Sequence, residues 1–328
     1  MILTADLHLD DRAENSYRWA VLDALIDNAE QGSTVAILGD LTDDRGRFSA
    51  LLVNRMVERL VTLTQCGVQV RILQGNHDAP LSGPSFWGFL NTIPGIAYIA
   101  GDPVLEEGGR LFVPYQADPA LLAGFLKGPY DQERVVFLHQ LITGAKVRGR
   151  ALEGISTSIL PSSLPTYAGD IHAPQKVGPV TYVGAPHPVD FGDDHRCRLL
   201  VLDDKSFAIK REIKLTPIRK LIAEIDTAGA LDRLDLRAGD QVKIRFTMPA
   251  EDTARWPAHA AAIAAWAERV GVTVSGTEVA LNTAETKAVF DADLDSPADL
   301  LAAFAKVEGI EGDLLKAGEV LLGKASRR

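Results

Sequence analysis

Metal-binding side chains follow a series of short apolar runs along the first half of the chain. The runs have the length and composition of buried β-strands and fall at residues 1–5, 35–38, 68–73, 135–138 and 167–168. The segments that follow them are Asp6-Leu7-His8, Gly39-Asp40, Gly75-Asn76-His77-Asp78, His139 and Asp170-Ile171-His172. Because the carboxyl ends of strands in an α/β sheet lie along one edge, we expect these segments to converge there. The pattern therefore predicts an α/β fold with a ligand site at a sheet edge.

The first 78 residues alternate between predicted strands and helices. Residues 15–30 and 49–65 have apolar side chains at helical spacing, and Ser49 and Gly67 are suited to begin and end the second helix. Beyond residue 78 short strands dominate, at residues 97–99, 111–113, 135–138, 180–183, 198–202 and 207–211. The sequence predicts an α/β (α+β) fold in which two sheets pack face to face, flanked by helices. Residues 144–164 have no clear period and are predicted to form a long loop.

No further metal-binding motif occurs after residue 215. Residues 220–225 and 241–246 are predicted strands, and residues 254–270, 297–307 and 313–322 are predicted helices. We therefore expect two domains, residues 1–215 with the site and residues 216–328 as a smaller α+β domain. The amphipathic helix at 313–322 either closes this second domain or docks a partner's coiled coil.

Composition excludes some classes of protein. The net charge is −10, which argues against a protein that coats nucleic acid non-specifically but not against phosphodiester chemistry at one site. The chain has two cysteines, no basic leader and no apolar run of about 18 residues. We therefore expect a cytoplasmic protein that does not enter a membrane.

Two divalent cations placed side by side need a shared carboxylate and a mixed shell of oxygen and imidazole ligands. Asp40 is the natural bridge, because a carboxylate can offer one oxygen to each ion. The other candidate ligands fall into pairs by motif: Asp6 with His8, Asn76 with His139, and Asp170 with His172. This ligand set favours a hydrolase of phosphate esters.

His77 stands next to a candidate ligand and is predicted to be a catalytic residue. It would protonate the leaving alkoxide or stabilise charge on the phosphate. Asp78 is predicted to orient His77 by accepting its second ring proton. The expected nucleophile is a hydroxide held by the cations.

Several other residues are candidates for contact with substrate. Lys146 and Arg148 lie between two ligand motifs, and Arg45 follows the Gly-Asp motif. They would bind phosphate or simply form a solvated surface. His187 is a further candidate contact.

Taken in order, Asp-x-His, Gly-Asp, Gly-Asn-His-Asp, a lone His and a final Gly-x-x-His resemble the calcineurin-like metallophosphoesterase superfamily over about 195 residues. Residues 183–193 (VGAPHPVDFGD) are similar to a stretch of the SbcD-type DNA repair nucleases. The resemblance implies a manganese-dependent DNA exonuclease and endonuclease, with magnesium as the alternative ion. It also implies a capping domain after the nuclease domain, an SbcC-type coiled-coil ATPase as partner, and a homodimer.

The resemblance also implies how the ligands divide between the ions. One ion takes Asp6, His8, Asp40 and His172, and the other takes Asp40, Asn76, His139 and Asp170. The chain departs from the family's usual Gly-His-x-His at Asp170, where a carboxylate replaces a histidine. We expect Asp170 to ligate manganese or magnesium; the alternative is that it does not ligate and this site fills poorly.

Two other functions remain open from the sequence. One is a phosphodiesterase or phosphatase of the same superfamily that acts on small molecules, and the other is a non-catalytic binding scaffold. The complete ligand set argues against the scaffold. The residue 183–193 stretch and the second domain argue against the small-molecule enzyme.

Overall fold

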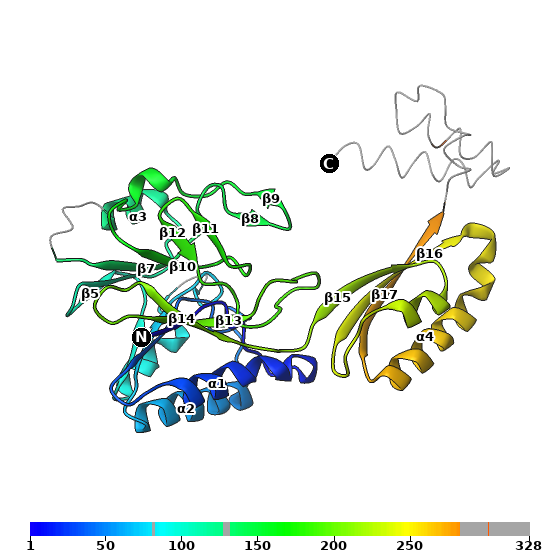
Figure 1. Ribbon diagram of the computed structural model, residues 1–328, viewed down its shortest axis with the longest axis horizontal. Helices are drawn as coiled ribbons and strands as arrows, with labels where there is room; N and C mark the ends of the chain where they lie inside the picture. Colours follow the sequence, from blue (N-terminus) through cyan, green and yellow to red (C-terminus); the bar gives the residue numbers. More distant parts are fainter. Residues whose placement is uncertain (81–82, 127–131, 283–300, 302–328) are drawn as a thin grey trace. The chain divides into compact units, whose positions relative to one another are not determined.

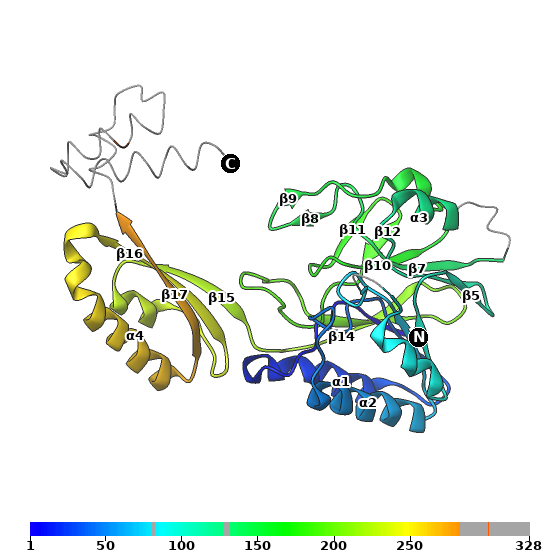
Figure 2. The same ribbon diagram turned by 180° about the vertical axis from the view of Figure 1, so that it is seen from behind.

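A computed structural model of the protein describes residues 1–80, 83–126, 132–282 and 301. Its first part contains two six-stranded sheets. Figures 1 and 2 show this part from opposite sides. The first sheet has the order β14-β13-β1-β2-β3-β4, and the second has the order β11-β12-β10-β7-β6-β5. The predicted α/β fold with two packed sheets is confirmed.

Strands β1 to β4 run parallel, and β13 and β14 add antiparallel pairs at one end. The strands of this sheet are β1 (Ile2–Thr4), β2 (Thr34–Ile37), β3 (Gln69–Leu73), β4 (Ile96–Ile99), β13 (Arg198–Leu202) and β14 (Ile209–Lys214). Parallel strands need crossover helices, and the crossovers here contain α1 (Ala20–Asn28) and α2 (Ala50–Gln65). Short 3-10 helices at Ala13–Trp19 and Phe86–Thr92 complete this layer.

The second sheet has four parallel strands between two antiparallel edges. Its strands are β5 (Val104–Glu106), β6 (Arg110–Val113), β7 (Val135–His139), β10 (Thr166–Gly169), β11 (Gln175–Val177) and β12 (Val180–Tyr182). Helix α3 (Pro119–Phe125) follows β6. A hairpin of β8 (Lys146–Val147) and β9 (Arg150–Ala151) and a 3-10 helix at Thr157–Ile159 lie in the segment predicted to be a long loop.

Three apolar clusters hold these layers together. Between the sheets, Leu3 and Leu38 of the first pack with Phe112 and Phe137 of the second. On the outer face of the first sheet, side chains of α1 and α2 cover β2 and β3. On the outer face of the second sheet, α3 and the loops around residues 142–160 cover the strands. Both sheets are therefore buried on two faces, which explains their continuous apolar sequences.

Helix α2 begins as the sequence predicts. The Ser49 side chain accepts a hydrogen bond of 3.1 Å from the Leu52 N–H, which satisfies one of the free donors of the first turn. Gly67 has a φ of +78°, the left-handed conformation that follows many helix ends.

A three-stranded sheet and a helix form the rest of the described chain. Its elements are β15 (Lys220–Ile225), a 3-10 helix at Ala228–Arg233, β16 (Gln241–Pro249), a 3-10 helix at Ala250–Arg255, α4 (Trp256–Val270) and β17 (Thr273–Asn282). Phe246 of β16 contacts the rings of Trp256 and His259 at centroid distances of 5.5 and 4.8 Å.

The chain divides into two compact units. The first comprises Met1–Ala223, Asp235–Lys243 and Ala267–Gly276, and the second comprises Glu224–Leu234, Ile244–Trp266 and Thr277–Arg328. The predicted division after residue 215 stays a prediction. The helices predicted at 297–307 and 313–322 lie outside the described residues, except for residue 301. Within the described parts, no helix is both long and apolar enough to cross a bilayer.

Candidate metal centre

The predicted ligands leave the carboxyl ends of strands in both sheets and meet in the first compact unit. Asp6 and His8 follow β1, Asp40 follows β2, Asn76 follows β3, His139 ends β7, and Asp170 and His172 follow β10. Leu9 and Thr42 form an isolated bridge that keeps the first two of these segments side by side. The site therefore draws ligands from two sheets rather than from the edge of one.

Asp6, Asp40 and His139 form a buried group whose ligand atoms all lie within 4.8 Å of one another. His139 Nε2 lies 3.4 Å from Asp40 Oδ1 and 3.7 Å from Asp170 Oδ1. On its other side, His139 Nδ1 lies 2.7 Å from the Leu38 carbonyl oxygen, to which it donates. This bond leaves the Nε2 lone pair directed at the carboxylates, as a metal ligand requires.

Glycines give these side chains the space they need. A Cβ on Gly39 would lie 2.1 Å from His139 Nδ1, and a Cβ on Gly75 would lie 2.2 Å from the Asp40 backbone nitrogen. A Cβ on Gly169 would lie 2.1 Å from the Leu38 carbonyl oxygen. The glycines beside the ligand motifs are therefore required by close approach of backbone and imidazole.

Four candidate ligands have left-handed backbone conformations. The φ angles are +55° at Asp6, +42° at His8, +51° at Asp40 and +87° at Asp170. Such conformations cost a non-glycine residue about 1–3 kcal/mol and gather at functional sites. The fold therefore holds all four residues in conformations that are unfavourable on their own.

The carboxylates create a strongly negative environment. Burial tends to lower the pKa of His139, but Asp40, Asp6 and Asp170 outweigh it and hold this pKa well above the usual value. Burial raises the pKa of Asp6 and also that of Asp170. For Asp40, burial is outweighed by His139, His8 and His77, which hold its pKa below the usual range. The group as a whole therefore favours an added positive charge.

Three atoms in this region are buried without a hydrogen-bond partner: Asp6 Oδ2 and both ring nitrogens of His8. His8 Nε2 lies 3.5 Å from Asp40 Oδ2, too far for a good hydrogen bond. An unpaired buried polar atom costs about 1–3 kcal/mol. A cation bound among these atoms would remove that cost, so the residues present fit a metal site.

The Asn76 amide also faces this group. One of its terminal atoms lies 2.9 Å from His139 Nε2 and 3.2 and 3.1 Å from the two Asp40 oxygens. Without a cation the amide nitrogen would donate to these acceptors. With a cation, half a turn of the amide presents its oxygen as a ligand. Asn76 therefore lies close enough to the group to serve as a ligand, and its role as a ligand stays a prediction.

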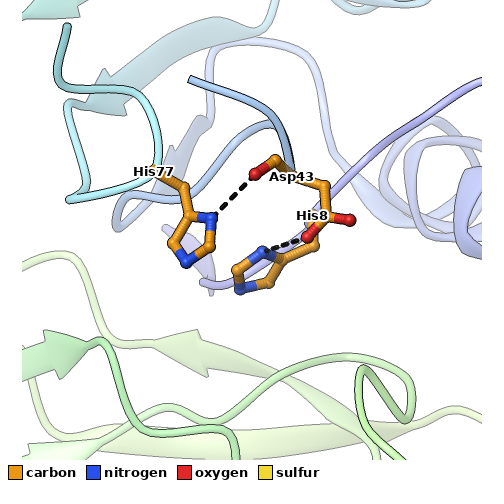
Figure 3. Close-up of side chains that lie close together, drawn as sticks. All are labelled: His8, Asp43 and His77. Carbon is orange, nitrogen blue, oxygen red and sulfur yellow. Dashed lines mark hydrogen bonds and ion pairs between the residues drawn. The ribbon is translucent and has the colours of Figure 1, made fainter. Parts of the chain in front are cut away.

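His77 forms a second group of candidate ligands with His8 and Asp43, as Figure 3 shows. Its Nδ1 lies 2.8 Å from the Asp43 backbone carbonyl oxygen, to which it donates, and its ring centroid is 4.7 Å from that of His8. The Asp43 carboxylate lies 3.3 Å from His8 Nδ1, and this interaction holds the pKa of Asp43 below its usual range. Asp43, which the sequence did not suggest as a ligand, thus orients the rings of both His77 and His8.

The predicted role of Asp78 is wrong, because this carboxylate does not contact the His77 ring. Its oxygens accept hydrogen bonds from the backbone N–H groups of Leu41, Thr42 and Gly75 at 3.0, 3.1 and 3.0 Å. Burial raises its pKa. Asp78 therefore joins the loop after β2 to the loop after β3.

His172 is oriented by a residue that the sequence did not single out. Its Nδ1 lies 3.3 Å from Asp193 Oδ2, which also accepts from the backbone N–H groups of Val189 and Asp190. Burial tends to lower the pKa of His172, but the Asp193 bond raises it overall. The same interaction lowers the pKa of Asp193 to about 2 against the effect of burial. Asp193 could have been suspected only from its place in the residue 183–193 stretch.

The candidate substrate residues fall in different places. Arg148 lines a cavity together with Asp170 and His172, and its Nη2 donates to the Phe191 carbonyl oxygen at 2.7 Å. Lys146 is exposed on β8 of the same hairpin, and Arg45 is exposed on the segment after Asp43.

The prediction that His187 contacts substrate is wrong. Its side chain is 2% exposed, and its Nε2 lies 2.9 Å from the Leu7 carbonyl oxygen, to which it donates. Burial holds its pKa well below the usual value, so the ring is neutral. His187 therefore stabilises the backbone between Asp6 and His8 through its hydrogen bond to Leu7.

Comparison with known proteins agrees with this geometry. A family model described as calcineurin-like phosphoesterase matches residues 1–195, and the chain belongs to that family. Metallophosphoesterases are hydrolases with a dinuclear metal site, and the buried clusters supply candidate ligands for it. No curated protein matches the chain. Among solved structures, the crystal structure of Pseudomonas putida nuclease MPE is similar, with 15% identity, 65% of this chain and 86% of that chain covered, and a TM-score of 0.30.

Proposed function

We propose that the protein is a phosphodiesterase of the SbcD type that cleaves DNA with two divalent cations, manganese or alternatively magnesium. The observation that carries this proposal is the meeting of three carboxylates with His139 at one buried point, within reach of a basic hairpin. Asp170, one of the candidate ligands, lines the same cavity as Arg148. A phosphodiester placed there would contact Arg148 directly and reach Asp170 through a bound cation.

The seven predicted ligands keep the roles that the sequence assigned to them. They would hold the two cations, which when bound activate water and neutralise charge on the phosphate. The ligands are Asp6, His8, Asp40, Asn76, His139, Asp170 and His172. The replacement of a family histidine by Asp170 adds negative charge, which favours manganese or magnesium over softer ions.

His77 is the proposed proton donor to the leaving oxygen. Its Nδ1 is fixed on the Asp43 carbonyl, which leaves Nε2 for the substrate. The Asp43 carboxylate lies 3.3 Å from His8 Nδ1, and this electrostatic contact holds the same loop in place. Asp43 is thus the orienting residue that Asp78 was predicted to be.

Binding to DNA is proposed for the hairpin of β8 and β9. Arg148 and Gly149 occupy its turn with φ values of +49° and +78°, the conformation of a tight two-residue hairpin. This geometry directs Arg148 toward the cavity, while Lys146 remains exposed. A cytoplasmic location, an SbcC-type ATPase partner and a homodimer are further parts of the proposal.

The test is release of nucleotides from end-labelled linear DNA with manganese, alongside hydrolysis of bis-p-nitrophenyl phosphate. The expected result is turnover of both. His77→Ala should abolish both activities and leave the metal content unchanged. Arg148→Ala should weaken DNA cleavage several-fold, whereas Arg59→Ala, a surface control on α2, should not.

Two results would overturn the proposal. If the small diester is hydrolysed and DNA remains intact, with and without an SbcC-type partner, the protein is a small-molecule phosphodiesterase. If neither substrate is cleaved by a metal-loaded protein, it is a binding scaffold.

A further inference from the structure

A second cavity opens beside the metal centre, on the side of His139. Its lining includes Asn76 and Asp170, and its volume is about 720 Å³. This lies within the range of roughly 300–1,000 Å³ typical of small-molecule sites. We call it the Tyr115 cleft.

Apolar side chains form most of the wall of the Tyr115 cleft. They are Tyr115, Pro119, Leu141, Ile155 and Ile159. The Tyr115 ring is half-buried, and its centroid lies 6.4 Å from that of His139. A planar group stacked on the Tyr115 ring would therefore lie close to His139, a candidate metal ligand.

Main-chain hydrogen bonds fix this wall to the strands that carry the ligands. The Tyr115 N–H donates to the Gln74 carbonyl oxygen at 2.9 Å, directly before the Gly-Asn-His-Asp segment. The Ile155 N–H donates to the Leu141 carbonyl oxygen at 2.9 Å, two residues after His139. The cleft and the metal centre are thus parts of one rigid arrangement.

The charges of the two cavities differ. The cavity shared by Asp170 and His172 is lined by four aspartates but also contains Arg148, a cation suited to phosphate. Among the described residues that line the Tyr115 cleft there is no lysine or arginine. Its polar groups include Gln140, whose side chain is 8% exposed and whose Oε1 accepts from the Gln116 N–H. This bond leaves the Gln140 amide N–H₂ as a donor, and the carboxylates of Glu153 and Asp170 are acceptors that disfavour an anion. The cleft therefore suits an uncharged group that has both hydrogen-bond donors and acceptors.

We propose that the Tyr115 cleft binds the nucleoside that remains on the phosphate after cleavage, with its base stacked on the Tyr115 ring. This inference rests on the proposed phosphodiesterase function. His77, the proposed proton donor to the leaving group, does not line the cleft, so the cleft faces the retained side. Stacking on an aromatic side chain tolerates any base, as a nuclease without sequence preference requires.

The experiment compares two substrates that share one leaving group. Thymidine 5′-(p-nitrophenyl phosphate) retains a nucleoside, and methyl p-nitrophenyl phosphate retains only a methyl group. Tyr115→Ala should lower kcat/KM for the thymidine ester roughly 5- to 100-fold, the range that base stacking supplies. Tyr115→Ala should change kcat/KM for the methyl ester by less than about twofold. Tyr115→Phe keeps an aromatic ring and should have a kcat/KM for the thymidine ester close to that of the wild type.

A second variant fills the cleft instead of emptying it. Ile159→Trp should also lower turnover of the thymidine ester and spare the methyl ester. Phe86→Ala is the matched control, because Phe86 is an aromatic residue that is 48% exposed and does not line the cleft. It should leave both esters unaffected.

The outcomes separate the two proposals. If wild-type protein with manganese hydrolyses neither ester, the phosphodiesterase function fails and the inference fails with it. The wild-type protein could instead hydrolyse both esters while the Tyr115 variants change the two rates equally or change neither. That result would overturn only the assignment of the cleft.

Discussion

Replacing Asp78 tests whether this residue braces the metal centre or acts through His77. Its two oxygens accept bonds from three buried backbone N–H groups and, at 3.3 Å, from the Thr42 hydroxyl. Asp78→Ala leaves three buried donors without a partner, at about 1–3 kcal/mol each. Its expected cost is on the order of 3–9 kcal/mol, a large part of the roughly 5–15 kcal/mol that stabilises a typical protein.

Asp78→Asn is the milder variant, because one oxygen remains as an acceptor. The new amide nitrogen faces donors, so about half of the bonds are lost, at roughly 2–3 kcal/mol. For a unit of about 200 residues this corresponds to a decrease in Tm of about 4–12 °C. The control Asp23→Asn breaks an exposed ion pair with Arg59 and should cost less than about 1 kcal/mol.

Thermal unfolding and manganese titration measure the two consequences. Both Asp78 variants should bind manganese more weakly, because the loops that Asp78 joins carry Asp40 and Asn76. A structural role for Asp78 would be contradicted if Asp78→Asn leaves Tm within about 2 °C of wild type and lowers turnover as much as His77→Ala does. That result would restore the role of orienting His77.

Three further changes have definite expected outcomes. Gly39→Ala should abolish manganese binding and lower Tm, because the added methyl would collide with the His139 ring; an unchanged titration would contradict the close approach. Ser49→Ala should cost about 1 kcal/mol in urea unfolding through loss of the helix cap, and no change would show that the cap is not formed. Burial raises the pKa of the Cys197 thiol to about 11, so below that pH it stays protonated; a thiol reagent at pH 8 should modify exposed Cys66 first and Cys197 only after denaturation. Rapid modification of both in the folded protein would contradict this.

The sequence predicted that the candidate ligands lie close together because they stand at strand ends, where topology leaves little choice. A buried strand followed by Asp or His places that side chain at the sheet edge, as happens after β1, β2 and β10. The sequence predicted two packed sheets, but it could not tell that the ligand-bearing strands are divided between them and meet where the sheets pair. That pairing depends on Leu3, Phe112 and other side chains distant in sequence.

The errors have a common physical cause. Asp78 is adjacent to His77 in sequence, but its side chain turns toward backbone N–H groups of another loop, and only tertiary structure reveals those donors. His187 was expected at the substrate because its neighbours resemble a nuclease stretch, yet the ring is buried against Leu7. The β8–β9 hairpin was missed because two-residue strands are too short to show an alternating pattern.

Manganese titration followed by electron paramagnetic resonance shows whether the residues around His139 hold two ions side by side. Two ions that share the Asp40 carboxylate should bind per chain and give an exchange-coupled spectrum. Asp40→Ala should remove that coupling. A single bound ion, or two ions with the spectra of isolated manganese, would contradict a dinuclear centre built by these residues.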